Sequence, residues 1–180
     1  MYEPYITDFT MNIHNKIYQN YVNNLNDLHN YIDNVINIDK FDIKKRGNIL
    51  FNSGGVLNHQ LFFSILGKGD MSEKFKEKII EDFGSVENFK EEFIKNANYL
   101  VGSGYTFLVL NKENKLEIIN TSNEDTPYSY GLIPIMNLDL WEHAYFLDYQ
   151  NNKEDYINNF FSIVDFNKVS QNYEEIQKNL

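Results

Sequence analysis

The sequence predicts an α+β protein with a long N-terminal α-hairpin lobe and a C-terminal α+β lobe that carries a short three-stranded antiparallel sheet. Two observations lead to this prediction. Apolar residues recur at helical spacing along the first part of the chain, and the period shortens to that of strands after residue 103. We place the division at residue 68, which gives an N-terminal domain, 1–68, and a C-terminal domain, 69–180.

The N-terminal domain should consist of two helices. The first is expected over residues 9–30, where apolar side chains follow helical spacing at Phe9, Ile13, Ile17, Tyr21, Leu25 and Leu28. An Asn- and Asp-rich stretch, 30–40, predicts the turn, and the second helix should follow over 41–66. Gly54-Gly55 lies inside that second helix, where glycine lowers stability, so we expect a kink or the close approach of another segment.

The C-terminal domain should begin with two helices, 71–82 and 85–100, the second with Ser85 as its N-cap. Three extended segments and three further helices should follow. The strands are expected at 104–110, 115–121 and 131–138, with a turn at 111–114 between the first two. The helices are expected at 141–151, 155–161 and 169–178.

Composition excludes several classes of protein. An apolar content of 42% over 180 residues is enough to form a core, which argues against a disordered chain. A net charge of −10 argues against nucleic acid as a partner, and the absence of cysteine excludes disulfides and thiolate metal sites. No apolar run has membrane-spanning length, and residues 1–5 lack signal-peptide features. We expect a soluble protein of the cytoplasm, or of an organelle lumen if a leader has been removed.

The most informative segment is Asp139-Leu140-Trp141-Glu142-His143-Ala144-Tyr145. An Asp and a His four residues apart can face one point from the start of a helix. Together they suit a redox-capable first-row metal with an open coordination position. Most such pairs are instead solvated or hydrogen-bonded. This pair lies in an apolar run, where buried charges need a partner, and a metal ion is one of few.

This segment resembles the block that carries the last two metal ligands in the iron/manganese superoxide dismutases. The resemblance extends collinearly over nearly the whole chain, through segments 10–14, 21–26, 58–62, 82–85, 102–105, 134–145, 147–151 and 155–157. It implies a homodimeric enzyme that converts superoxide to oxygen and hydrogen peroxide while its metal cycles between the +3 and +2 states. The alternative is a non-enzymatic structural subunit of a larger assembly such as a ribosome, marked by damaged ligands and a basic surface.

The resemblance implies one metal ion per subunit, held between the two domains. The ligands would be His14 from the first helix, His59 from the second, and Asp139 with His143 from the C-terminal lobe. A single histidine such as His14 could equally be a core residue, but all three in order with Asp139 favour a ligand set. His29 matches no family segment and is interpreted as a surface residue of the hairpin.

Three further features of the substrate channel follow from the resemblance. Tyr21 matches the tyrosine beside the metal-bound solvent, although it follows His14 by one residue fewer than is usual; the alternative is an ordinary core tyrosine. Lys153 matches an arginine at the channel mouth, where a cation would attract an anionic substrate toward an acidic protein. An aromatic shell around the metal is matched by Phe63, Tyr105, Phe107 and Trp141.

Glu142 matches a residue that crosses the dimer interface of the family and holds the other subunit's equivalent of His143. A carboxylate on the second nitrogen of a ligating imidazole fixes its tautomer and orientation. The family also has a His–Tyr pair across the interface, which is matched here by two apolar residues, Ile17 and Phe146.

Glu124 is the clearest departure from the family pattern. Manganese-type members have a glutamine at this position that donates to metal-bound solvent, whereas iron-type members supply the amide from the second helix, at the position of Gly55. This layout favours manganese over iron. An ionised Glu124 could only accept a hydrogen bond and a protonated one could donate, and the sequence leaves both states open.

Overall fold

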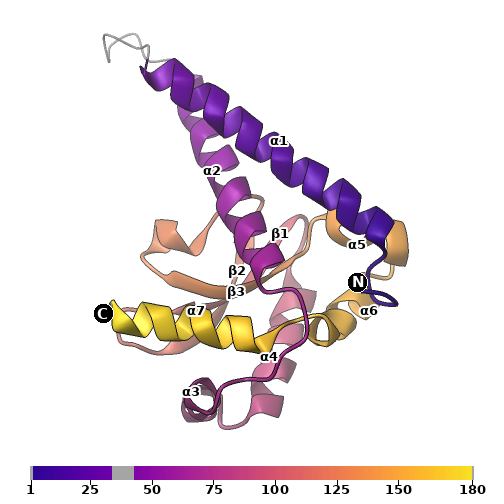
Figure 1. Cartoon of the computed structure of the whole chain (residues 1–180), viewed down its shortest axis with the longest axis vertical. Helices are drawn as coiled ribbons and strands as arrows, with labels where there is room; N and C mark the ends of the chain where they lie inside the picture. The colour runs from indigo at the N-terminus through magenta and orange to yellow at the C-terminus, as the bar shows by residue number, and fades with distance from the viewer. Residues whose placement is uncertain (1, 34–42, 180) are drawn as a thin grey trace.

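A computed structural model of the chain describes residues 2–33 and 43–179. The N-terminal part forms two long antiparallel helices, α1 (Asp8–Asp33) and α2 (Ile43–Ser64), which pack against each other and project from the rest of the molecule (Figure 1). Most of the turn expected at 30–40 lies outside the described residues. None of the helices in the described part of the chain has the length and apolar content needed to cross a bilayer.

The C-terminal part is α+β, as the sequence predicts, with a three-stranded antiparallel sheet and additional helices. Its elements are α3 (Glu73–Phe83), α4 (Val86–Tyr99), β1 (Gly104–Leu110), β2 (Leu116–Ser122), η2 (Pro127–Tyr130), β3 (Ile133–Asp139), α5 (Glu142–Tyr149), α6 (Lys153–Asn159), η3 (Phe160–Ser162) and α7 (Phe166–Lys178).

The helix boundaries follow from capping side chains. Ser85 caps α4 as predicted, since its side chain accepts a hydrogen bond from the Asn88 amide. The last two main helices begin two or three residues earlier than predicted, because Asn152 caps α6 and Asp165 caps α7. The two short 3-10 helices η2 and η3 were not among the predicted elements, since such short turns carry no periodic signal.

The sheet has the strand order β2-β1-β3, so β1 is central and every one of its residues is buried. The turn between β1 and β2 forms at the predicted position. Asn111 stabilises it, because its side-chain oxygen accepts hydrogen bonds from the amides of Glu113 and Lys115 at 2.9 Å each. On the other side, the pairing of β1 with β3 is irregular beside Pro134, which lacks an amide proton.

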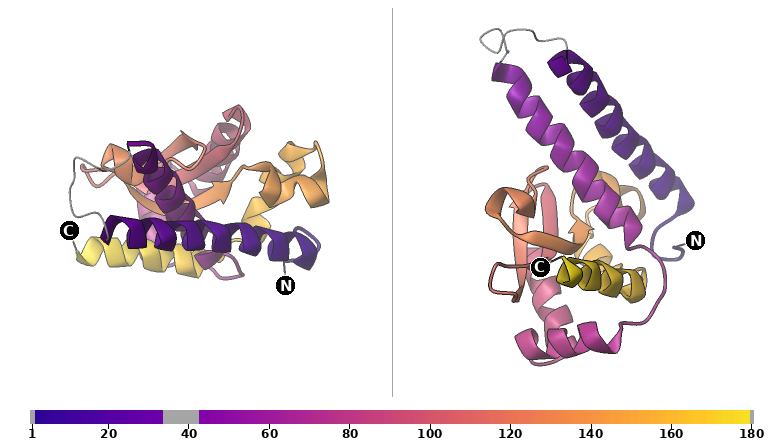
Figure 2. Two further views of the ribbon diagram at one scale, coloured as in Figure 1. Left: turned by 90° about the horizontal axis from the view of Figure 1, so that it is seen from above. Right: turned by 60° about the vertical axis from the view of Figure 1, so that its left-hand side comes forward.

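The two faces of the sheet pack against different parts of the molecule. On one face Tyr105, Phe107 and Val109 pack with Leu61 of α2. The alternate residues of β1, Leu108 and Leu110, belong to the main core, which includes α4 and the C-terminal helices (Figure 2). The hairpin therefore packs on one face of the sheet.

The start of α1 is fixed to the end of α5. Thr7 caps α1, since its hydroxyl oxygen accepts from the Thr10 amide at 3.2 Å. Asp148 of α5 in turn accepts from the Thr7 amide at 2.9 Å and from the Thr7 hydroxyl at 2.7 Å. Tyr149 donates to the Tyr5 carbonyl oxygen at 2.6 Å. These bonds hold the first turns of α1 beside α5.

The sequence predicts either a kink at Gly54-Gly55 or the close approach of another segment. The structure shows close approach of other segments to α2. A Cβ atom on Gly54 would lie 1.8 Å from the carbonyl oxygen of Glu124. On Gly55 it would lie 2.5 Å from ring atoms of Tyr21. Any side chain at either position would displace the backbone after β2 or the ring from α1.

Candidate metal centre

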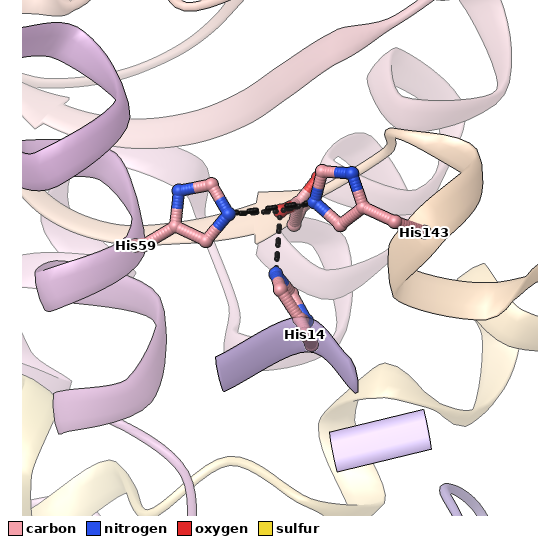
Figure 3. Close-up of side chains that lie close together, drawn as sticks. His14, His59 and His143 are labelled. Carbon is pink, nitrogen blue, oxygen red and sulfur yellow. Dashed lines mark hydrogen bonds and ion pairs between the residues drawn. The ribbon is translucent and has the colours of Figure 1, made fainter. Parts of the chain in front are cut away.

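Four side chains from separate elements converge between the hairpin and the sheet. His14 lies on α1, His59 on α2, Asp139 at the end of β3 and His143 on α5, and one potential ligand atom from each lies within 4.8 Å of the others. The three imidazoles point toward one place (Figure 3). Asp139 Oδ2 lies 3.0 Å from His14 Nε2, 3.2 Å from His143 Nε2 and 3.7 Å from His59 Nε2.

Asp139 is oriented by the strand-to-helix junction on which it lies. Its Oδ1 atom accepts a hydrogen bond from the Trp141 amide at 2.9 Å, and its backbone carbonyl accepts one from the Tyr156 hydroxyl at 2.9 Å. The side chain is fully buried. Because Oδ1 is already bonded to the backbone, Oδ2 is the oxygen presented to the histidines.

His59 is oriented within its own helix. Its Nδ1 donates to the Gly55 carbonyl oxygen at 2.7 Å, one turn earlier, so Nε2 is the nitrogen that faces the cluster. Burial lowers the pKa of His59 to about 4. Burial also lowers the pKa of His14, despite the opposing effect of Asp139. Both rings are therefore neutral at physiological pH and have a lone pair available for a metal.

Asp139 and His143 stabilise each other's charged forms. Burial alone would raise the pKa of Asp139, but the positive charge of His143 and hydrogen bonds from the histidines hold it well below its usual range. Burial alone would lower the pKa of His143, but the Asp139 carboxylate outweighs burial and raises it. Because a coordinating imidazole must be neutral, metal binding would compete with protonation of His143.

The donor set fits iron or manganese. Three imidazole nitrogens and one carboxylate oxygen suit first-row metals and leave further coordination positions open for solvent or substrate. In the cluster, three histidine nitrogens surround a single buried carboxylate oxygen. A bound cation would give this buried negative charge a partner.

Glu124 lies beside this cluster but is not one of the four converging side chains. It is 2% exposed and accepts hydrogen bonds from the Tyr21 hydroxyl at 2.9 Å, the Tyr105 hydroxyl at 3.0 Å and the Asn58 side-chain amide at 3.4 Å. Burial, together with the charge of Asp139, raises the pKa of Glu124 to about 7. Burial and the adjacent carboxylate also raise the pKa of Tyr21.

Three of the four residues expected in the aromatic shell contact the histidines. The ring centroid of Phe63 lies 4.9 Å from that of His14, Trp141 lies 5.8 Å from His143, and Tyr105 lies 6.2 Å from His59. Phe107 lies behind Tyr105, at 5.8 Å, and among the described residues its ring contacts no histidine.

Lys153 and Glu142 are not among the converging side chains. Lys153 begins α6, and its ammonium donates to the Leu100 carbonyl oxygen, at the end of α4, at 3.2 Å. Glu142 is the exposed first residue of α5. His143 Nδ1 has no hydrogen-bond partner among residues 2–33 and 43–179, so its second nitrogen is available to another group.

Sequence reasoning missed several residues that line the site. Tyr18 stacks on the His59 ring at 5.9 Å with an interplanar angle of 6°. Asn58 donates to Glu124, and Phe51 of α2 contacts Tyr21 at 5.8 Å. Tyr18 could have been found from spacing, because it follows His14 by four residues and precedes Tyr21 by three, which puts all three on one helix face.

A helical hairpin joined to an α+β lobe, with a largely buried three-histidine, one-aspartate cluster between them, defines a class of protein with a candidate metal site suited to redox chemistry. Family comparison makes the assignment specific. Residues 1–67 match the family model for the iron/manganese superoxide dismutase alpha-hairpin domain, and residues 71–172 match that for the C-terminal domain. The chain belongs to the iron/manganese superoxide dismutase family.

Curated relatives support the same assignment. The chain is 38% identical to a superoxide dismutase [Mn/Fe] of Methylomonas sp. (strain J), over 96% of this chain and 92% of the relative. It is 40% identical to superoxide dismutase [Mn/Fe] 2 of Staphylococcus aureus (strain Mu50 / ATCC 700699), over 96% of this chain and 91% of the relative. The similarity therefore covers both lobes.

Proposed function

We propose that this protein is a superoxide dismutase that binds one manganese ion per subunit through His14, His59, Asp139 and His143. The observation that carries the proposal is the convergence of three imidazoles and one carboxylate within 4.8 Å, with all but His143 fully buried. The reaction consumes two superoxide ions and two protons and yields oxygen and hydrogen peroxide. A metal ion held by these four residues would supply the redox chemistry, because it could take an electron from one superoxide and give it to the next.

The residues of the chain prepare the site for this reaction. Neutral His14 and His59 supply lone pairs, and the buried Asp139 supplies the anionic ligand. Phe63 and Trp141 pack against the ligating rings and limit the access of water. Tyr21 lies half-buried at the edge of the cluster, with its hydroxyl held by Glu124, which supports its role as the residue at the substrate channel.

The preference for manganese is supported by the surroundings of Gly55. The Tyr21 ring occupies the space in which a side chain at Gly55 would begin, so α2 cannot supply an amide there unless Tyr21 moves. The polar group beside the cluster comes instead from Glu124. Donors from α1, α2 and β1 hold this carboxylate, which supports a role in tuning the metal rather than binding it.

The proposed dimer is supported by the exposed face of α5. Phe146 and Leu147 are 49% and 47% exposed, and the neighbouring His143 Nδ1 lacks a hydrogen-bond partner within the described residues. We propose that Glu142 of the partner subunit binds this nitrogen.

Light scattering should show a dimer at micromolar concentration. Glu142→Ala should lose the dimer or the metal, whereas Glu154→Ala, at an exposed position of α6, should keep both. A monomeric parent, or a Glu142→Ala dimer with full metal content, would contradict this proposal.

The decisive experiment on function combines metal analysis with an activity assay. Protein loaded with manganese or with iron should contain about one ion per subunit, because the four candidate ligands form one cluster. The manganese form should be the more active. Activity confined to the iron form would overturn the manganese preference. A fully loaded protein with no activity in either form would instead favour a structural subunit, although four preserved candidate ligands and a net charge of −10 argue against that role.

A further inference from the structure

Two tyrosines of α1, and not only one, cover the candidate ligand His59. His14, Tyr18 and Tyr21 follow one another at intervals of four and three residues, so they share one face of the helix. The Tyr18 ring lies nearly parallel to the His59 ring, at 5.9 Å and 6°. The Tyr21 ring lies 5.2 Å from His59 at an angle of 43°. Tyr18 also contacts Phe63 at 5.8 Å.

The hydroxyl groups of these two tyrosines differ in their partners. The Tyr21 hydroxyl donates to Glu124 at 2.9 Å. The Tyr18 hydroxyl makes no hydrogen bond with any residue of the described part of the chain, and the side chain is only half-buried. A phenol in this situation normally bonds to solvent or to a ligand, because an unpaired hydroxyl is costly to bury.

We propose that Tyr18 is a second tyrosine of the substrate site. Its ring is a positioning group, which holds the His59 imidazole in plane by stacking while Gly55 holds the Nδ1 atom. Its hydroxyl is a hydrogen-bond donor for a small oxyanion that approaches the cluster. This inference rests on the proposed function, because it assigns Tyr18 to the binding of the same anionic substrate.

Two variants separate the ring from the hydroxyl. Tyr18→Phe keeps an aromatic ring and removes the donor, whereas Tyr18→Leu removes both. Tyr99→Phe, at a position that is 69% exposed on α4, controls for the general effect of removing a phenol. The measurements are superoxide turnover, the dissociation constant of azide as a small anionic probe, metal retention in competition with a chelator, and the thermal midpoint of the metal-free protein.

Tyr18→Phe should retain metal as the parent does, while azide affinity and turnover fall roughly threefold to tenfold, as expected for one lost hydrogen bond. Tyr18→Leu should in addition lose metal roughly tenfold more readily, as expected when the support of a ligand is removed. An unchanged midpoint of the metal-free variants would show that these losses do not come from unfolding.

Two results would overturn the inference. If Tyr18→Phe matches Tyr99→Phe in azide affinity and turnover, the hydroxyl does not contact the anion. If Tyr18→Leu retains metal as well as Tyr18→Phe, the ring does not position His59. These results can be told apart from a failure of the proposed function. If the metal-loaded parent has no superoxide turnover, the proposed function fails, but azide affinity and metal retention can still be compared between the parent and the Tyr18 variants.

Discussion

Two buried carboxylates lie in one site, and their pKa values are shifted in opposite directions. Asp139 is fully buried and Glu124 is 2% exposed, so both have lost nearly all contact with water. The pKa of Asp139 nevertheless lies well below its usual range, whereas that of Glu124 is raised to about 7. Burial acts in the same direction on both, so the difference must come from their neighbours.

The neighbours of Asp139 carry or can acquire positive charge, whereas the groups hydrogen-bonded to Glu124 are neutral. Histidine nitrogens lie 3.0–3.7 Å from Asp139 Oδ2. Glu124 accepts hydrogen bonds from two phenols and an amide, and the negative charge of Asp139 disfavours its ionised form. Asp139 is therefore a permanent anion suited to bind a cation. Glu124 can take either protonation state near neutral pH, and a bound cation would favour its ionised form.

The largest effect should follow from removing the charge of Asp139. Asp139→Asn keeps the shape of the side chain but removes the anionic ligand, so metal affinity should fall by more than about 100-fold, beyond the losses known for groups that only support ligands. Activity should be lost with the metal. Chelator competition measures the affinity, and Asp70→Asn, at an exposed position, is the control. Full metal content in Asp139→Asn would mean that Asp139 is not a ligand.

A second effect concerns the stability of the metal-free protein. The pKa of Glu124 rises from 4.5 to about 7 on folding, so the folded state binds the proton more tightly than the unfolded chain. Glu124 therefore opposes folding progressively as pH rises between these values, by up to about 3 kcal/mol. A glutamine at this position does not ionise. The free energy of unfolding of Glu124→Gln, relative to that of the parent, should therefore increase from pH 5 to pH 8.

Urea unfolding of the two metal-free proteins at several pH values measures this difference. Glu113→Gln, in the exposed turn between β1 and β2, should show no pH-dependent difference from the parent. If the free energies of unfolding of Glu124→Gln and the parent differ by a constant amount over this pH range, Glu124 is ionised throughout and the contrast with Asp139 is lost.

Glu124→Gln should also change catalysis while metal content stays near stoichiometric. An anion favours the oxidised metal, whereas accepting a bond from bound solvent favours the reduced one. We therefore expect a change of roughly tenfold in turnover or in metal preference, the scale of losses known for groups around a metal's ligands. The reduction potential and pH profile of the loaded variant test this prediction. A variant that matches the parent in both, and in activity, would make Glu124 a bystander.

The smallest effect is expected at Lys153, which should act through its electric field rather than through contact. Lys153→Glu should lower the bimolecular rate constant for superoxide by roughly threefold to tenfold at low ionic strength. The loss should shrink as salt screens the charge. Lys115→Glu makes the same change in net charge from an exposed position next to the β1–β2 turn and should have less effect. A loss that does not depend on salt would indicate that Lys153 acts through its bond to Leu100.

The sequence by itself determined the order and type of the main elements. Helical periodicity, the change to strand periodicity and the cap at Ser85 are local signals, because they depend on residues within a few positions of one another. The pairing of Asp139 with His143 was also local, since four residues separate them. The resemblance to a known family then added His14 and His59 as partners, and the structure brings all four side chains together.

Only the tertiary structure decided what surrounds these residues. Glu124 receives hydrogen bonds from α1, α2 and β1, over sequence separations of 103, 66 and 19 residues, and no local pattern encodes their meeting. For the same reason the stacking of Tyr18 on His59 and the fit of Tyr21 against Gly55 became visible only once the helices were packed. The charge of a buried carboxylate depends on these neighbours. The sequence could therefore name Glu124 as unusual but could not assign its protonation state, which is a property of the packed site.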